Sequence, residues 1–431
     1  MEMKNTVIYR GSLPPEKEYV LDYVHQLCEP AGDVVFPLRG GRPLVSVGDI
    51  VLSGQKLCEK EDGGACVHSS CSGTVRSIER RPTGRGRVEC VVVENDRKFR
   101  LAPGVGTESD WMELGRTEIL ARIRAAGAAG TSPWKYPTAA KLGELHPDSV
   151  SRVVLDGSEW EPIVSSDDDI LRTHAYGVVT GMRILLRLFP GAEGVILIGE
   201  EKTGAIDSIL NAVDESAGIR VLAVPEGRPL GDERMIGELL FGQSEMSAHC
   251  LVETPAEANA IYEAVCRSTP FIRRVVTVAG SAVKNPGNYL VRLGTSCAEL
   301  LSAAGGLRPG AEVQRAVLGG PLSGLCLSTL DVPVEKDTSA LLLFAEDEEV
   351  LSRQAQTECI RCGRCARACP VGLMPMLMLK AAEAGDLKRY GGPLHGDKCI
   401  ACGVCTWICP AKRPLAQMFA YTGRLLDSSG Q

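Results

Sequence analysis

The sequence predicts a multidomain protein that combines α/β and α+β units, and three observations support this fold class. Short apolar runs separated by turns fill the first 110 residues, which is typical of β structure. Strands and helices alternate from about residue 127 to about residue 265, as in an α/β layer. A cysteine-rich segment occupies the C-terminal part. With 431 residues, of which 44% are hydrophobic, the chain can fill several cores.

We expect four units, at residues 1–110, 111–268, 269–335 and 336–431. In the first unit, the stretch 43–55 alternates apolar residues around two glycine-containing turns. A further strand opens at 72–75. This pattern resembles the barrel-sandwich hybrid of lipoyl and biotinyl domains. Because no lysine stands at the hairpin position that would carry a swinging cofactor, we interpret the unit as a scaffold.

The second unit should begin with a helix from Thr117 to Ala126, with Thr117 as its N-cap and Gly127 as its stop. Beyond it, the apolar pattern predicts strands at 152–155, 194–198 and 219–223, and helices at 171–188 and 205–216. In the third unit, the pattern predicts a strand at 274–280, a turn at 285–287, a helix near 296–304 and a turn-rich segment at 318–324.

The fourth unit carries two matching cysteine runs, each with the spacing C-x2-C-x2-C-x3-C followed by proline. The runs comprise Cys359, Cys362, Cys365 and Cys369, and then Cys399, Cys402, Cys405 and Cys409. This is the pattern of bacterial ferredoxins with two [4Fe–4S] clusters, in which the fourth cysteine of each run ligates the other cluster. Cluster I is therefore predicted to take Cys359, Cys362, Cys365 and Cys409, and cluster II to take Cys399, Cys402, Cys405 and Cys369.

A pair of four-cysteine zinc sites is the alternative interpretation of these runs. Such sites normally join two C-x2-C hooks across a longer loop, so the two complete runs favour iron–sulfur clusters. Between the runs, residues 375–384 are predicted to form a helix rich in Met and Leu. Its methionines are expected to pack against the clusters rather than ligate them.

Composition narrows the possible partners and compartment. The formal net charge of −7 argues against nucleic acid as a partner. The nine cysteines outside the runs form no disulfide pattern, and the polar N-terminus shows no secretory signal, so we expect a reducing cytoplasm. No apolar run approaches the ~20 residues of a membrane span. Any membrane association is therefore expected to be peripheral, at the inner face of the cell membrane and through a partner.

Over nearly its whole length the chain resembles RnfC, a subunit of Rnf-type ion-pumping ferredoxin:NAD oxidoreductases. The shared motifs are Val47-Gly48-Asp49 with Gly54-Gln55, Ser72–Val75, Glu159-x-Glu161-Pro162 with Asp167-Asp168, Val275–Tyr289, Gly319–Gly324 and the double cysteine run. The resemblance implies four modules: the barrel sandwich, a flavin/NADH domain like the large flavoprotein subunit of complex I, a soluble-ligand-binding β-grasp (SLBB) module and the clusters. It also implies docking to membrane partners, here Rnf subunits.

Three family motifs are eroded. The family's glycine-rich loop, which approaches flavin and nucleotide phosphates, corresponds to residues 127–138, where Ser132 and Pro133 replace two glycines and Trp134 an alanine. An Asn and a Thr near the flavin fall around Thr254 and Glu257, and neither residue is kept. A third string survives at 228–234 without its tyrosine.

Two interpretations of this domain follow. Either it still binds FMN and NADH through Glu159, Glu161, Asp167 and Glu200, or it has lost both cofactors and serves as a scaffold. The three eroded motifs favour loss, so we expect the clusters to be the working redox centres. The run Asp167–Asp169 also fits an acidic helix N-terminus as well as it fits a ligand site.

Two further groups of residues have open interpretations. Cys66 and Cys71 flank His68 and form either a redox-active thiol pair or two ordinary thiols, and the wide spacing favours the second. Arg361, Arg364 and Arg367 lie within the first cysteine run. They either tune the cluster and dock an acidic ferredoxin, or are solvated loop residues.

The sequence thus predicts an RnfC-like iron–sulfur electron-transfer protein, a subunit or partner of an oxidoreductase rather than a stand-alone catalyst. It would pass electrons between a donor at the potential of NADH or ferredoxin and partner redox proteins. One alternative is a soluble protein that feeds a D-proline-reductase-type enzyme in an anaerobe, with Cys66 and Cys71 taking part. A second alternative is a non-redox scaffold with vestigial clusters.

Overall fold

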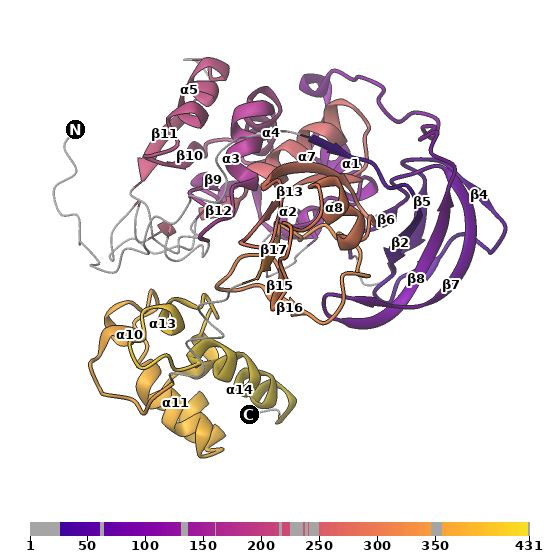
Figure 1. The fold of residues 1–431 in the computed structure, drawn as a ribbon. Coiled ribbons are helices and arrows are strands. Elements are labelled where there is room, and N and C mark those ends of the chain that lie inside the picture. The colour runs from indigo at the N-terminus through magenta and orange to yellow at the C-terminus, as the bar shows by residue number, and fades with distance from the viewer. Residues whose placement is uncertain are drawn as a thin grey trace.

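The computed structural model describes residues 26–60, 64–130, 137–159, 161–214, 218–224, 236–237, 240, 250–345 and 356–429. Four sheets and a separate helical domain make up this part of the chain (Figure 1). The multidomain α/β and α+β class is confirmed, whereas the exact limits of the four units stay a prediction. None of the helices in the described ranges is long and apolar enough to cross a membrane.

The first module is a sandwich of two small sheets. One sheet has the order β2-β8-β7-β4, and the other has the order β3-β5-β6. The strands are β2 (Asp33–Pro37), β3 (Arg42–Pro43), β4 (Ile50–Val51), β5 (Lys56–Glu59), β6 (Val67–His68), β7 (Gly73–Thr83) and β8 (Gly86–Asn95). Alternate apolar residues of these strands, including Val34, Phe36, Leu57 and Val91, fill the core between the sheets.

The second module is a parallel sheet of four strands in the order β11-β10-β9-β12. Its strands are β9 (Arg152–Gly157), β10 (Glu193–Gly199), β11 (Ile219–Val224) and β12 (Cys250–Glu253). The helices are α1 (Arg116–Ala125), α2 (Thr138–Glu144), α3 (Ser166–Thr173), α4 (Ala175–Leu188), α5 (Thr203–Ala212) and α7 (Pro255–Cys266), with short 3-10 turns η1 (Trp111–Glu113) and η2 (Pro147–Ser149). The carboxyl ends of the parallel strands meet at one edge, where α/β folds place ligand sites.

Three helix predictions in this module need correction. The helix predicted at 205–216 is α5, which ends at Ala212 because Val213 adopts an extended backbone. The helix predicted at 171–188 is two helices, because the chain leaves helical geometry at His174 between α3 and α4. The first helix begins one residue early, and Gly115 rather than Thr117 is its N-cap. Its predicted end is confirmed, since Gly127 adopts a φ of 65°, a conformation that glycine tolerates without strain.

The third module is a mixed six-stranded sheet with the order β1-β14-β13-β17-β15-β16. Its elements are β1 (Gln26–Cys28), β13 (Arg273–Ala279), β14 (Gly287–Arg292), β15 (Arg315–Leu318), β16 (Leu325–Leu327), β17 (Ala340–Phe344) and α8 (Cys297–Ala303). The predicted strand, turn and helix between 274 and 304 are confirmed. The edge strand β1 pairs in parallel with β14, although it precedes the first module in sequence.

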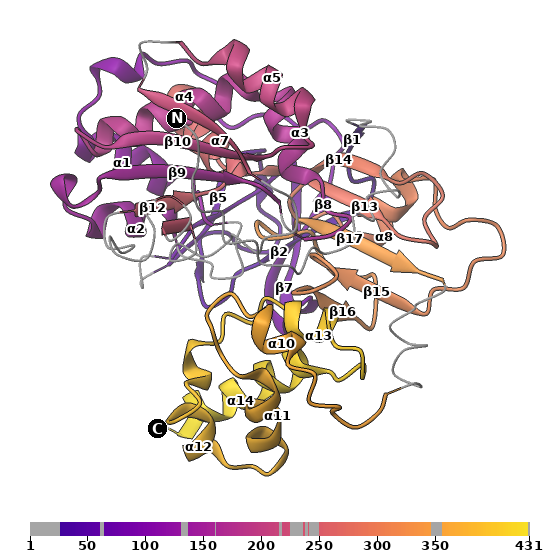
Figure 2. The ribbon, with the colours of Figure 1, turned by 90° about the vertical axis from the view of Figure 1, so that its left-hand side faces the viewer.

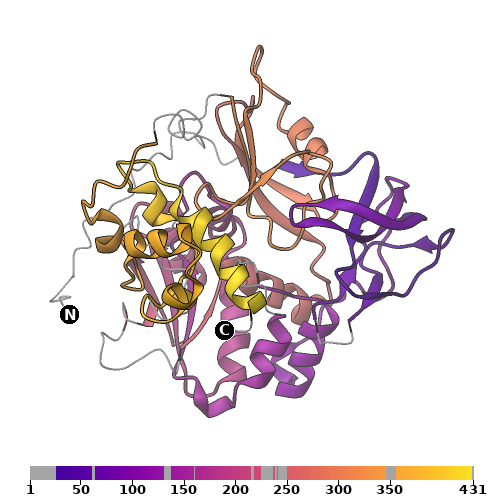
Figure 3. The same ribbon diagram turned by 90° about the horizontal axis from the view of Figure 1, so that it is seen from below.

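The helical domain lies below β15 and β16 in Figure 2, and Figure 3 shows it from beneath. Its elements are α10 (Arg364–Arg367), α11 (Pro375–Glu383), α12 (Leu387–Gly391), η4 (Gly396–Lys398), α13 (Val404–Trp407) and α14 (Leu415–Ser429). The helix predicted between the cysteine runs is α11. Its Met376 and Met378 belong to the apolar cluster that contains Cys365 and Cys369, so the expected packing is confirmed.

Candidate functional site

The two cysteine runs adopt the same backbone path twice. Each run leads into a single-turn helix, α10 or α13, through a glycine of positive φ: 72° at Gly363 and 77° at Gly403. Two residues after the first cysteine of each run, Arg361 or Ala401 also has a positive φ. Such tight, repeated loops turn successive cysteines toward one point.

The second run lines a partly open pocket. Cys399, Cys402 and Cys405 line this pocket, and so does Cys369 from the first run. Leu373, Met378 and Phe419 contribute to an apolar wall. The structure therefore brings together the four thiols predicted for cluster II, including the one that crosses over from the other run.

The first run has a different environment. Burial raises the pKa of the Cys365 thiol, and the charges of Cys409 and Cys359 add to this effect. Cys409 comes from the second run, and its assignment to the first cluster stays a prediction. Cys359 and Cys362 are exposed, whereas the four thiols of the other set are half-buried. Cluster I would therefore lie nearer to solvent than cluster II.

Electrostatics explains why these thiols need iron. The pKa of Cys402 is raised to about 12, mainly because the thiol is buried. The charges of Cys369 and Cys399 raise it as well. Burial and neighbouring thiols raise the pKa of Cys405 still further. Four thiolates would repel one another here, and cationic iron removes that penalty. The amide of Leu373 donates to Sγ of Cys369 over 3.3 Å, which would stabilise a thiolate ligand.

The residues present therefore fit two [4Fe–4S] clusters. Across the described ranges, no three His, Cys, Asp or Glu side chains are grouped closely enough to hold a metal ion. The two observations are compatible because a cube of four irons and four sulfides keeps its thiolates further apart than one ion does. The individual ligand assignments stay a prediction.

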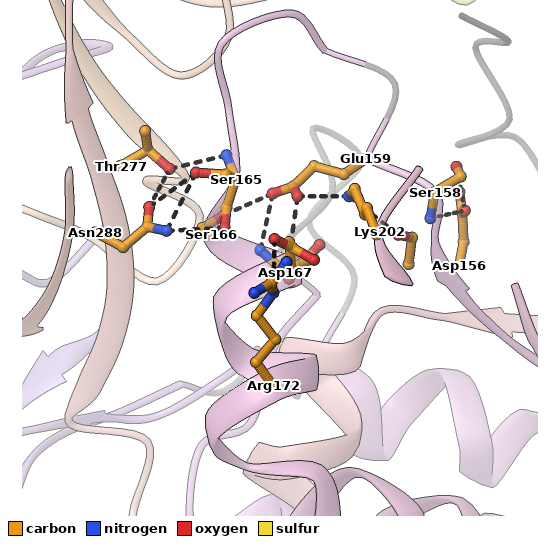
Figure 4. A network of polar contacts seen from close by, with 12 residues as sticks. Asp156, Ser158, Glu159, Ser165, Ser166, Asp167, Arg172, Lys202, Thr277 and Asn288 are labelled. Atoms are coloured by element: carbon orange, nitrogen blue, oxygen red, sulfur yellow. Dashed lines mark hydrogen bonds and ion pairs between the residues drawn. The ribbon is translucent and has the colours of Figure 1, made fainter. Parts of the chain in front are cut away.

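A second polar site lies at the N-terminus of α3, and Figure 4 shows it. The carboxylate of Glu159 accepts hydrogen bonds from the amides of Asp167 (2.8 Å) and Asp168 (3.2 Å). Its Oε2 also lies 2.9 Å from Nζ of Lys202, and both side chains are at most 5% exposed. An anion at a helix N-terminus is stabilised by the free amides and the helix dipole. Glu159 thus supplies this anion from within the chain.

The other side of the same helix end is fixed to the six-stranded sheet. The Ser165 amide donates to Oγ1 of Thr277 over 3.0 Å, and its hydroxyl donates to Oδ1 of Asn288 over 3.2 Å (Figure 4). Thr277 and Asn288 lie on β13 and β14 and are fully buried. A satisfied buried network of this kind holds two modules in one relative position.

The three aspartates that follow behave as a helix N-terminus. Asp168 is buried and pairs with Arg172 over 3.2 Å one turn later. The pKa of Asp167 is raised to about 8, mainly because its carboxyl group is buried. The negative charge of Glu159 raises it further. The interpretation of Asp167–Asp169 as an acidic first turn is confirmed.

Asp167 makes the stability of the fold depend on pH. Its folded pKa of about 8 exceeds the ~3.9 of an exposed aspartate, so the folded protein binds more protons between these values. The free energy of unfolding should therefore fall as pH rises from about 4 to about 8. Asp167→Asn removes this titration, and its melting temperature is expected to fall less than that of the parent protein over this range.

The measurement is thermal unfolding of both proteins across this pH range at constant ionic strength and equal iron content. Asp148→Asn is the control, because the Asp148 side chain is 83% exposed, and it should follow the parent protein. Identical pH slopes for the parent and for Asp167→Asn would show that another group governs the dependence.

The remaining sequence-predicted carboxylates are placed differently. Glu161 points to the 319–324 loop of the third module, where it accepts hydrogen bonds from the amides of Leu322 (3.0 Å) and Ser323 (2.9 Å). Burial outweighs these bonds and raises the pKa of Glu161 to about 7. Glu200 is exposed at the end of β10. The structure thus brings together Glu159 and Asp167, while Glu161 binds another module.

The FMN that this type of domain implies does not fit the residues in the described ranges. Glu159 already takes the α3 amides, and Thr254 and Glu257 close the α7 N-terminus with a reciprocal capping box. Gly127 faces the first module: a Cβ there would lie 2.4 Å from the Cys66 carbonyl oxygen. Within the described residues, the N-termini of α3 and α7 are therefore already occupied by carboxylates of the chain itself. Ser132, Pro133, Trp134 and the 228–234 string lie outside the described residues.

Cys66 and Cys71 have different surroundings. Cys71 is fully buried in the sandwich core, and burial raises its pKa to about 12. The carbonyl of Cys66 accepts a hydrogen bond from Nζ of Lys336 over 2.6 Å, and Lys336 also donates to the Gly127 carbonyl over 2.6 Å. Burial lowers the pKa of Lys336 to about 8. The redox role of the two thiols stays a prediction.

Sequence reasoning missed Lys202 and Lys336. Lys202 follows the carboxyl end of β10, and that position is a signal for a residue that reaches the ligand edge of a parallel sheet. Lys336 has no comparable signal, because its partners Cys66 and Gly127 are distant in sequence.

Four family models match the chain. They describe an RnfC barrel sandwich hybrid domain at residues 12–98, a Nuo51 FMN-binding domain at 123–266, an SLBB domain at 275–325 and a 4Fe-4S dicluster domain at 358–413. The dicluster match agrees with the two cysteine runs. It supports two [4Fe–4S] clusters in this chain.

Among curated relatives, the chain is 31% identical over 386 residues to the C subunit of the proton-translocating ferredoxin:NAD(+) oxidoreductase complex of Clostridium ljungdahlii. That alignment covers 86% of this chain and 83% of the relative. The C subunit of the ion-translocating oxidoreductase complex of Erwinia tasmaniensis is 34% identical over 79% of this chain, which spans only 43% of that relative. The crystal structure of an air-oxidised NAD+-reducing [NiFe]-hydrogenase shares the fold, with a TM-score of 0.50 and 18% identity over 76% of this chain and 68% of that one.

Proposed function

The chain belongs to the RnfC family, the C subunits of ion-translocating oxidoreductase complexes, and we propose that it carries electrons through its two clusters alone. Membership makes it an RnfC-like iron–sulfur electron-transfer protein. The alternatives of a proline-reductase partner and of a non-redox scaffold are not favoured. The flavin-type domain is then a scaffold that positions the cluster domain.

The observation that carries this proposal is the pocket that Cys369 shares with Cys399, Cys402 and Cys405. [4Fe–4S] clusters supply one-electron transfer when bound. The protein provides the ligands, an apolar wall from Leu373, Met378 and Phe419 that excludes water, and an amide donor to Cys369. Burial and amide donors are the means by which a protein sets a cluster's potential.

Anaerobic reduction of the purified protein by dithionite tests the proposal. Two reduced [4Fe–4S] signals are expected in electron paramagnetic resonance spectra. A sample that contains its full iron and stays silent after reduction would contradict electron transfer and support the scaffold alternative.

We propose that a redox partner docks at the exposed side of cluster I, and we call this surface the docking site. Cys359 and Cys362 are exposed there, as are Ile360 at 64% and the side chains of Arg361, Arg364 and Arg367. Residues 356–426 contain ten Arg or Lys and four Asp or Glu, a balance of +6 within a chain of net charge −7. A basic face with an exposed apolar residue suits an acidic one-electron carrier of the ferredoxin type.

Reversing the charges of the three arginines tests this docking site. The triple variant Arg361→Glu, Arg364→Glu, Arg367→Glu should slow reduction by an acidic ferredoxin by roughly 10-fold or more at low salt, since it removes electrostatic steering. Stopped-flow rates at increasing ionic strength measure the effect, and the rates of the two proteins should converge at high salt. The control reverses Lys388 and Arg389, exposed cations of α12. If the control slowed the reduction by ferredoxin equally, the docking site would not be specific.

We also propose that the protein works at the inner face of the cell membrane, held there by partner subunits of an Rnf complex. The names of its relatives as components of such complexes support this proposal. Co-purification of tagged protein with Rnf membrane subunits from gently solubilised membranes is the corresponding measurement.

A further inference from the structure

We propose that Glu161 is a positioning residue for the cluster held by Cys369, Cys399, Cys402 and Cys405. It fixes the 319–324 loop, and that loop supports the turn that carries Cys402. The inference rests on the proposed function, in which this cluster carries electrons. It gives a carboxylate of the flavin-type domain a role in the cluster domain.

The first step is the hold of Glu161 on the loop. Its two carboxylate oxygens accept the Leu322 amide (3.0 Å), the Ser323 amide (2.9 Å) and the Ser323 hydroxyl. The loop approaches so closely that a Cβ on Gly320 would lie 2.2 Å from Cδ of Glu161. Three hydrogen bonds converge on this one carboxyl group, so the contact fixes the loop backbone.

The second step is the contact between the loop and the cluster domain. A Cβ on Gly403 would lie 2.5 Å from the Leu322 carbonyl oxygen, so these two backbones touch. Gly403 has a φ of 77° and stands between Cys402 and α13. Leu322 therefore donates its amide to Glu161 while its carbonyl borders the cysteine turn.

The third step is the anchoring of Glu161 itself. Ile163 and Val164 pack with Val317 and Leu342 in a buried cluster, which ties the Glu161 segment to the six-stranded sheet. Ile163 is held at a φ of 72°, which a β-branched residue adopts only when its surroundings impose it. The chain of contacts from Glu161 through Leu322 to Gly403 thus begins at a rigid part of the fold.

Amide hydrogen exchange of Glu161→Gln, together with resonance spectra of the reduced protein, tests the inference. A glutamine keeps one acceptor and turns an NH2 group toward the loop donors, so the Leu322 and Ser323 amides should exchange roughly 10-fold faster. The resonance signal of the cluster on the second run should shift, while that of the other cluster stays unchanged. Glu312→Gln, an exposed site in the module that carries the 319–324 loop, is the control and should alter neither measurement.

Two results would overturn the inference: unchanged exchange at Leu322 and Ser323, or faster exchange with both cluster signals unaltered. The exchange measurement does not need bound clusters, so it separates a failure of this inference from a failure of the proposed function. Gly403→Ala disturbs the contact between Gly403 and Leu322 while Glu161 stays intact. This variant should shift the signal of the same cluster selectively. If both cluster signals stayed unchanged, the proposed chain of contacts would be contradicted.

Discussion

Replacement of Cys369 with alanine is expected to destroy the cluster built on the second cysteine run and to spare the cluster built on its own run. The physical reason is the shared pocket, in which Cys369 is the fourth thiol beside Cys399, Cys402 and Cys405. Its loss leaves one iron without a thiolate. The iron content should fall from about eight toward about four per chain, or a three-iron cluster should appear.

The measurement combines iron and sulfide counting with electron paramagnetic resonance of the anaerobically reduced protein. Cys409→Ala should give the mirror result and remove the other cluster, because the crossing rule assigns Cys409 to that cluster. Cys326→Ala is the matched control, since Cys326 is exposed and outside both runs. If Cys369→Ala removed the cluster of Cys359, Cys362 and Cys365 instead, the crossed assignment would be wrong.

Replacement of Lys202 with methionine is expected to lower the free energy of unfolding by about 3–5 kcal/mol. Lys202 and Glu159 are both almost fully buried, and their charged groups are 2.9 Å apart. Burial alone would lower the pKa of Lys202, but the carboxylates of Glu159 and Asp168 raise it, so the lysine stays charged. Its removal would leave the Glu159 carboxylate buried without a cation.

Chemical denaturation of the parent and variant proteins measures this loss. Adding Glu159→Gln to Lys202→Met should recover part of it, because the unpaired charge is then gone. The control is Lys56→Met, whose partner Glu59 is 2.7 Å away but half exposed, and its cost should stay below about 1 kcal/mol. Equal losses in the two lysine variants would refute the buried ion pair.

The parts of this protein that can be predicted from sequence are those encoded by neighbouring residues. Spacing within a short loop decides cluster chemistry, so the sequence alone assigns the eight thiols to two sets. Apolar runs and turn residues predict β9, β10 and α11, because these signals are local. The break at His174 escapes prediction because apolar residues continue on both sides of it.

The partners of the carboxylates could not be predicted, because they come from distant parts of the chain. Glu161 binds amides 161 and 162 residues away, and backbone amides carry no sequence signal. Glu159 and Lys202 are 43 residues apart and meet only because β9 and β10 are adjacent in the sheet. A motif can therefore survive in sequence while its side chains take on new partners.

Anaerobic purification followed by iron and flavin counting tests the central claim most directly, namely that two clusters and no flavin carry the electrons. We predict about eight irons per chain, no stoichiometric FMN, and no reduction of the clusters by NADH in the isolated protein. One tightly bound FMN per chain, with NADH-dependent reduction of the clusters, would contradict the account.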